Sequence, residues 1–279
     1  MKRPRRRRRC RALTAAVLAS AVLLPASGCA QSVDPIERLG KKAASRVRPH
    51  GRDGEPAYRH WGLGSPLSPA PTPPVRPAGR RTKGRSLPPV VDRVRTRDRV
   101  VFLTYGDGTE KDARFADMVR ELRLPVSVFL TDRAAGPGYA RLARLQSAGA
   151  GVQNHTLGHA SLRGLSYAGQ RAEICGQQDK LKSRFGHRPR LFRPPHGTYD
   201  RTTLRAAGDC GVSAVVLWRA EMTADGITYT HGSERLRPGD IVNVAPDDST
   251  ARTLCDRTTR LLRRAQSRGL TVGRLEDYL

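Results

Sequence analysis

The stretch from Val100 to Gly108, VVFLTYGDG, joins an apolar run to a carboxylate in a glycine-rich turn. A short, continuous apolar run that includes β-branched residues is typical of a strand buried on both faces of a parallel sheet. We therefore predict a strand over Val100–Thr104, with Asp107 just beyond its carboxyl end. The histidine pair of HTLGH, residues 155–159, follows a second strand-like run, Gly151–Asn154. Because parallel α/β folds build their sites where strand ends meet, these three polar side chains are expected to converge.

The converging residues form a ligand set of one carboxylate and two imidazoles. A spacing of four residues puts His155 and His159 on one side of a single turn. Such a set suits Zn²⁺, or a similar divalent ion such as Co²⁺ or Ni²⁺, with coordination positions left open for chemistry. Two histidines four apart usually hold no metal, so the prediction depends on the acidic strand end. We predict a metal site at Asp107, His155 and His159, with Zn²⁺ favoured.

Strand-like and helix-like patterns alternate from Arg99 onward. Apolar runs predict strands, and apolar residues at helical spacing predict helices. The predicted strands are 100–104, 126–130, 151–154, 190–192, 213–218, 241–244 and 271–275, and the predicted helices are 113–122, 138–148, 167–185, 201–209 and 249–269. Polar residues follow several of these strands, and a barrel brings all such ends to one mouth. We therefore predict an α/β fold, a small, distorted (β/α) barrel of about seven parallel strands.

The first 28 residues are typical of a signal peptide, with a cationic segment to Arg11 and an apolar segment from Ala12 to Ala26. The sequence ASGC at 26–29 resembles a bacterial lipobox, although Ala26 stands where Leu is usual. Lipidation of Cys29 would anchor the exported chain to the outer face of the cytoplasmic membrane. The alternative is ordinary cleavage near Ala26 and a secreted protein.

Residues 29–97 have the composition of a disordered, flexible, Pro/Arg-rich tether, which precedes a folded domain over 98–279. One short apolar patch, Tyr58–Leu63 with Trp61, is expected to dock, and the folded domain is a candidate surface.

The formal net charge is +26, and it is unevenly distributed. Residues 1–99 contain 24 Lys/Arg against 6 Asp/Glu, and residues 100–279 contain 27 against 19. The excess therefore belongs mainly to the leader and the tether. No nucleic-acid-binding motif is present and aromatics are only 5%, so nucleic acid is not an expected partner. Anionic lipid headgroups and acidic cell-wall polymers fit better.

Three cysteines remain once Cys10 leaves with the leader and Cys29 is lipidated: Cys175, Cys210 and Cys255. Three is an odd number, so at most one disulfide forms and one thiol stays free. None stands in a metal-ligand pattern, and a structural role is expected for all three.

The motifs resemble those of the polysaccharide deacetylases with a NodB-homology domain, carbohydrate esterase family 4. The resemblance covers roughly residues 98–279. The family's motif Thr-Phe-Asp-Asp-Gly is matched by TYGDG at 104–108, His-Ser/Thr-x-x-His by HTLGH at 155–159, and an Arg-x-Pro-Pro-like motif by RPPHG at 193–197.

The resemblance implies a role for each matched residue. Asp107, His155 and His159 would hold the metal, and the backbone amide at His196 would stabilise an oxyanion. Arg193 would orient the catalytic base. The residues implied to contact substrate are Pro194, Tyr199 and Trp218.

Two departures from the family pattern concern proton transfer. Gly106 stands where the family has its general base, and Asn243-Val244-Ala245 stands where a Leu-x-His motif supplies the general acid. His196, and Asp247 or Asp248 beyond the sixth strand, are the candidate substitutes. Each proton-transfer group contributes about 10²–10⁴ in rate, so losing both predicts weak turnover.

The sequence thus predicts a metal-dependent hydrolase that removes N- or O-linked acetyl groups from cell-wall polysaccharide. It is expected to act as a monomer. An O-acetyl esterase tolerates the missing acid better, because an alkoxide leaves more readily than an amine. The alternative is a non-catalytic, metal-holding lipoprotein that binds glycan or acts as a scaffold.

Overall fold

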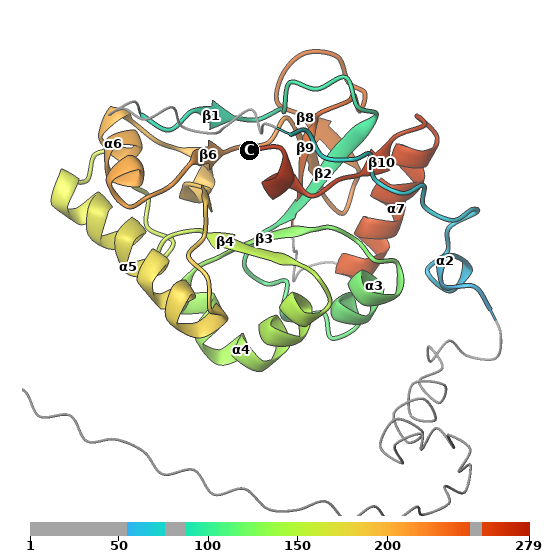
Figure 1. Ribbon diagram of the computed structural model, residues 1–279, viewed down its shortest axis with the longest axis horizontal. Coiled ribbons are helices and arrows are strands. Elements are labelled where there is room, and N and C mark those ends of the chain that lie inside the picture. Colours follow the sequence, from blue (N-terminus) through green and yellow to red (C-terminus); the bar gives the residue numbers. More distant parts are fainter. Residues whose placement is uncertain (1–54, 76–86, 246–252) are drawn as a thin grey trace, which may run out of the picture. The chain divides into compact units, whose positions relative to one another are not determined.

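The computed structural model describes residues 55–75, 87–245 and 253–279 (Figure 1). The predicted leader, the lipidation candidate Cys29 and the candidate Asp247 lie outside the described residues. None of the helices in the described part of the chain combines the length and the apolarity that a membrane span needs.

A curled, mostly parallel sheet forms a half-barrel at the centre of the fold. The strands of the described residues are β1 (Val90–Val91), β2 (Val100–Tyr105), β3 (Ser127–Leu130), β4 (Gly151–Asn154), β5 (Leu191–Phe192), β6 (Ala214–Val216), β7 (Ala220–Met222), β8 (Ile227–Tyr229), β9 (Ile241–Val244) and β10 (Thr271–Val272). Their order is β1-β6-β5-β4-β3-β2-β9-β7-β8, with β10 paired to β2. Only the β7–β8 pair of these strands is antiparallel. The predicted fold class is confirmed.

The central strand β2 is buried on both faces, as its apolar run predicts. Val101, Leu103 and Tyr105 pack with side chains from the helices α3 (Phe115–Glu121) and α7 (Leu254–Gln266). Val100 and Phe102 instead pack with Leu275, Tyr278 and Leu279 near the end of the chain. Alternate residues therefore serve two apolar layers, which explains why the run shows no polar alternation.

The remaining helices are α2 (Ala57–His60), α4 (Asp132–Ser147), α5 (Tyr167–Phe185) and α6 (Arg201–Asp209). Helices α5, α4, α3 and α7 follow one another along the sheet (Figure 1). Helix α4 begins at Asp132, so the start expected at Gly138 is wrong. The Thr131 hydroxyl caps it by accepting a hydrogen bond from the Ala134 amide, and the helix continues through the Gly136-Pro137-Gly138 segment that suggested a break.

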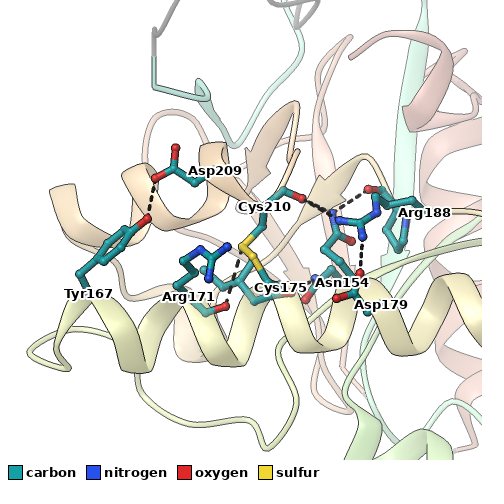
Figure 2. The surroundings of a disulfide bond; sticks show 11 residues. Asn154, Tyr167, Arg171, Cys175, Asp179, Arg188, Asp209 and Cys210 are labelled. Carbon is teal, nitrogen blue, oxygen red and sulfur yellow. Dashed lines mark hydrogen bonds and ion pairs between the residues drawn. A yellow bond between two sulfur atoms is a disulfide. The ribbon is translucent and has the colours of Figure 1, made fainter.

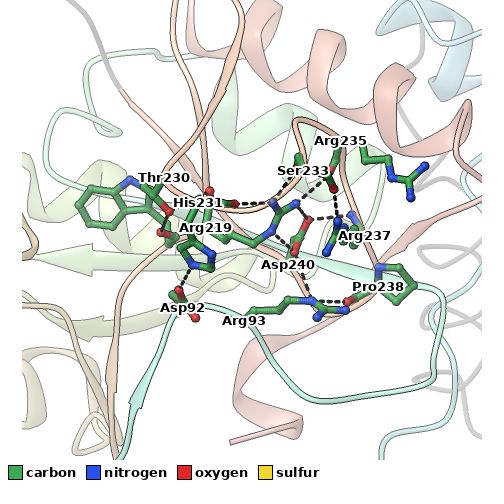
Figure 3. Close-up of polar contacts among 11 residues, drawn as sticks. Asp92, Arg93, Arg219, Thr230, His231, Ser233, Arg235, Arg237, Pro238 and Asp240 are labelled. Carbon is green, nitrogen blue, oxygen red and sulfur yellow. Dashed lines mark hydrogen bonds and ion pairs between the residues drawn. The ribbon is translucent and has the colours of Figure 1, made fainter.

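Strands β7 and β8 form an antiparallel pair that the sequence pattern did not predict. A buried ion pair organises it: Arg219 Nε lies 2.6 Å from Asp240 Oδ1, and the side chains are 2% and 0% exposed. The same guanidinium donates to the carbonyls of His231, Ser233 and Arg235 (Figure 3). Asp240 in turn raises the pKa of Arg219. One buried cation thus holds the loop that follows β8 against β9.

The apolar patch around Trp61 packs onto α7 and α3. Trp61 is 5% exposed, and its indole donates to Glu121 Oε2 at 2.8 Å. Thr259 donates to the Trp61 carbonyl, and Leu63 is 3% exposed. Strand β1 likewise pairs with β6. The packed part of the chain therefore includes residues before 98, the position at which the sequence predicts that the folded domain starts.

A disulfide joins Cys175 of α5 to Cys210 at the end of α6 (Figure 2). Next to it, the Tyr167 hydroxyl donates to Asp209, and Arg188 donates to the Cys210 carbonyl. Cys255 is free and buried. The three cysteines in the described part of the chain therefore form one bridge and leave one thiol, as predicted.

We expect reduction of this disulfide to lower the free energy of unfolding by about 3–4 kcal/mol, because the bridge closes a loop of 35 residues in the unfolded chain. Urea unfolding with and without reductant measures this difference. A Cys175→Ser/Cys210→Ser variant is the control and should not respond to reductant. Equal midpoints for the oxidised and reduced protein would contradict the prediction.

Candidate active site at the strand ends

A pocket of about 920 Å³ opens at the carboxyl ends of the parallel strands. The residues that line it follow different strands: Asp107 follows β2, His155 follows β4, Arg193 follows β5, Trp218 follows β6 and Ala245 follows β9. Parallel strands and their crossovers bring these distant segments together. Pro194 and Tyr199 do not line the pocket, while Trp218 does.

The two histidines face each other. His155 Nδ1 lies 2.8 Å from the Arg193 carbonyl, which fixes Nδ1 as the protonated nitrogen and leaves the Nε2 lone pair available. His155 Nε2 is 3.1 Å from His159 Nε2. Burial lowers the pKa of His155 to about 3, so its imidazole is neutral at physiological pH. Two neutral imidazole nitrogens that converge on one point suit a divalent cation.

The loop that carries the histidines is held in an unusual backbone conformation. Thr156 and His159 have φ values of 73° and 61°. The Thr156 amide donates to the Asn154 side chain, and the amides of Leu157 and Gly158 donate to one oxygen of Glu173. These bonds offset the cost of the left-handed conformation and fix where the imidazoles point.

The Asp107 carboxylate is held by Thr131. Its two oxygens accept from the Thr131 amide at 2.9 Å and from the Thr131 hydroxyl at 2.7 Å. Burial raises its pKa, and these two bonds together with His159 oppose that shift. Thr131 directly follows β3, so the strand-end rule that identified Asp107 could also have found it.

The donor set therefore fits a metal in part. His155 and His159 present nitrogens at suitable positions, and each Asp107 oxygen keeps a second lone pair beside its bond to Thr131. Within the described ranges, however, no three His, Cys, Asp or Glu side chains have the arrangement of a metal centre. The two imidazoles fit, and the carboxylate is turned toward Thr131.

Arg193 is a buried cation with neutral partners. Its guanidinium donates to Asn243 Oδ1 at 2.8 Å and to the Thr104 hydroxyl at 2.6 Å, and its buried Nε has no partner among the described residues. The aromatic rings of Phe129 and Trp218 flank it at 4.3 and 5.1 Å. Burial lowers the pKa of Arg193 to about 9, and the charge of Glu221 opposes this.

Asn243 links Arg193 to Glu221, because its amide donates to Glu221 Oε1 at 2.8 Å. Neither Asn243 nor Glu221 was predicted as a site residue. Asn243 lies on β9, whose other residues, Ile241, Val242 and Val244, are apolar and buried. A lone polar residue in such a strand was the available signal.

His196 lies at the mouth of the pocket with its backbone at φ 58°. Its ring is exposed and packs edge-on against His159, with the ring centroids 4.8 Å apart. Gly197 lies next to the Trp218 ring, and a Cβ there would be 3.4 Å from that ring, which is an ordinary van der Waals distance. The left-handed backbone at φ 67° therefore explains the glycine.

The low pKa of His155 makes stability pH-dependent in the metal-free protein. Its pKa is about 3 when folded and 6.5 ordinarily. Between these values the unfolded state binds a proton that the folded state does not, so stability falls as pH falls. The slope from this one group is about 1.4 kcal/mol per pH unit. Urea unfolding in chelator measures the free energy of unfolding of the wild type and of His155→Gln. The stability of the wild type relative to the variant should decrease by this slope as the pH falls below 6.5. Parallel pH profiles for the two proteins would contradict the prediction.

The sequence and the fold of this chain are similar to those of known proteins. Residues 93–215 match the sequence profile of the family described as Polysaccharide deacetylase. A curated relative, the uncharacterized protein SCO4760 of Streptomyces coelicolor, is 65% identical over 204 residues, which is 73% of this chain and 82% of the relative.

Among solved structures, the fold is similar to that of wild-type BA3943, described as a pseudoenzyme of carbohydrate esterase family 4 from Bacillus anthracis. The TM-score is 0.58 at 18% identity, over 67% of each chain. A BA3943 mutant described as having restored enzymatic activity matches with a TM-score of 0.58 at 19% identity, over 67% of this chain and 70% of the mutant.

Proposed function

We propose that this chain is a polysaccharide deacetylase, as the match of residues 93–215 to that family supports, and that it removes acetyl groups from a cell-envelope glycan with a turnover limited by two missing proton-transfer groups. The observation that carries the proposal is the pair of neutral imidazoles, with Nε2 atoms 3.1 Å apart, beside Asp107 in one pocket. We assign the cation site to His155, His159 and Asp107, with Zn²⁺ favoured over Co²⁺ or Ni²⁺. A cation held there would supply a Lewis acid for the acyl carbonyl.

The rest of the pocket provides orientation. Trp218, which borders the pocket and packs near Gly197, offers an apolar surface for the acetyl methyl group. The backbone at His196, at the mouth of the pocket, is the proposed oxyanion donor. His196, Glu110, Lys111 and Glu221 also line the pocket, and each has a side chain that could carry a proton. Glu110 accepts from the Gly108 amide and Glu221 from Asn243, so the His196 imidazole is the better candidate for the acid.

The two substituted positions both border the pocket. Gly106 and Ala245 contribute no titratable group there. Without a general acid, an amine is a poor leaving group and an alkoxide is a better one. We therefore propose that acetyl esters are cleaved faster than acetamides.

A non-catalytic, glycan-binding protein is the second candidate. It is favoured by the Arg193 network, in which the guanidinium bonds to Asn243 and Thr104 and no carboxylate of the described residues accepts a hydrogen bond from it. The likeness in fold to a protein described as a pseudoenzyme, and to its mutant with restored activity, also supports a weakened site in this chain.

We further propose export and anchoring through a lipid on Cys29, with acetylated cell-wall polysaccharide as the partner. The Cys175–Cys210 disulfide supports export, because such bonds persist in oxidising compartments.

The test is acetate release by the full chain from O-acetylated xylan oligomers and N-acetylated chito-oligomers, each with Zn²⁺ and with chelator. We expect slow release from the ester, slower release from the amide, and loss of both in chelator. Binding of the oligomers with no release under any condition would leave the glycan-binding alternative and reject the hydrolase.

A further inference from the structure

One wall of the pocket is formed by helix α4. Four of its residues line the cavity: Arg133, Ala134, Gly138 and Arg141. The middle of this wall has almost no side-chain bulk. A Cβ at Gly138 would lie 2.7 Å from Glu110 Cγ, so a larger residue there would require the Glu110 side chain to move. The wall is therefore a shallow, small-residue surface with an arginine near each end.

Both arginines are positioned by contacts to the loops of the site. The Arg133 amide donates to the Leu157 carbonyl at 3.1 Å, which ties the start of α4 to the histidine loop. Arg141 Nη1 donates to the Glu110 carbonyl at 3.3 Å, on the loop that carries Asp107. The Arg141 guanidinium thus borders the loop that carries Asp107, and burial together with the charge of Arg133 lowers the pKa of His159.

The acidic and basic side chains around the pocket differ in whether they have partners within the protein. The three carboxylates that line it accept bonds from the protein: Asp107 from Thr131, Glu110 from the Gly108 amide and Glu221 from Asn243. In the part of the chain that the structure describes, the exposed Arg133 guanidinium has no hydrogen bond or ion pair, and Arg141 has no carboxylate partner. Another arginine of the same helix, Arg144, lies 3.7 Å from Asp117.

We propose that the pocket selects an acetylated glycan that carries carboxylates, and that Arg133 and Arg141 bind a carboxylate on a sugar next to the acetylated one. This inference rests on the glycan-binding part of the proposed function. A guanidinium matches the planar geometry of a carboxylate and binds it through two parallel N–H···O bonds. A neutral acetylated glycan leaves both guanidinium groups to solvent.

The experiment measures binding of the full chain to three oligosaccharides of equal length by calorimetry. The first alternates N-acetylglucosamine and glucuronic acid, the second is the same oligomer with its carboxylates reduced to alcohols, and the third is a neutral chito-oligomer. We expect the anionic oligomer to bind about tenfold more tightly than either neutral one, since one to two charge-assisted bonds at an exposed site are gained. The advantage should decrease with added salt.

Variants identify the residues. Arg133→Gln/Arg141→Gln should remove the anionic preference and leave the affinity for the neutral oligomers unchanged. Arg144→Gln, on the same helix but outside the pocket, should keep the preference. Equal affinities for the anionic and reduced oligomers, or a preference that survives the double variant, overturns the inference while the proposed function stands. Failure to bind any of the three oligomers overturns the proposed function itself.

Discussion

Gly106→Asp is expected to raise acetate release by about two to four orders of magnitude, the usual contribution of a positioned general base. Gly106 borders the pocket and directly precedes Asp107. It is not among the residues with positive φ, and a Cβ built on it meets no atom within 4 Å. A carboxylate can therefore be added here without strain in the backbone and without displacing a neighbour.

The surroundings are already suited to that carboxylate. Arg193 lines the same pocket as a buried cation, and its hydrogen-bond acceptors are an amide and a hydroxyl. A nearby carboxylate would compensate the buried charge, which burial alone disfavours. The new aspartate should thus be held ionised, as a base must be.

Gly106→Asn is the matched control, because it adds the same volume without a basic carboxylate. Acetate release from acetylated chito-oligomers is measured for both variants and the wild type in the presence of Zn²⁺. Equal rates for the Asp and Asn variants would show that a base is not what limits turnover. Adding Ala245→His to Gly106→Asp then tests whether the missing acid sets the remaining limit.

The strand-end argument predicted that Asp107 and the histidine pair would lie close together, because the carboxyl ends of parallel strands meet at one edge of a sheet. Asp107 and His155 are far apart in sequence, and both line one pocket. Arg193 and Trp218 line it as well, but the family resemblance and not the apolar runs implied them.

Other features of the fold depend on side-chain contacts, which the spacing of apolar residues in the sequence does not reveal. Strands β7 and β8 are three residues each, and they are held by the Arg219–Asp240 pair rather than by a pattern of apolar residues. The engagement of Asp107 by Thr131 is a side-chain contact between neighbouring strand ends, which no linear spacing reveals. Helix α4 begins at Asp132, where the Thr131 hydroxyl caps it, and it includes the Gly-Pro-Gly segment that suggested a later start.

His155→Ala and His159→Ala should each abolish stoichiometric binding of Zn²⁺, a loss of affinity of more than about 100-fold, because even residues that only support a metal ligand contribute 10–100-fold. The two Nε2 atoms are 3.1 Å apart, so each variant removes half of the converging nitrogen pair. His187→Ala is the control, since that exposed ring lies in a loop outside the pocket.

Calorimetric titration of the metal-free protein measures this binding without reference to turnover. Asp107→Asn tests whether the carboxylate is a metal ligand beside the two histidines. Its carboxylate is already engaged by Thr131, so the cost of this change depends on whether the cation draws on the remaining lone pairs. A loss as large as that of His155→Ala identifies Asp107 as a third ligand, and a small loss identifies a site made by the histidines. Binding that persists in both histidine variants would show that the imidazole pair is not a metal site.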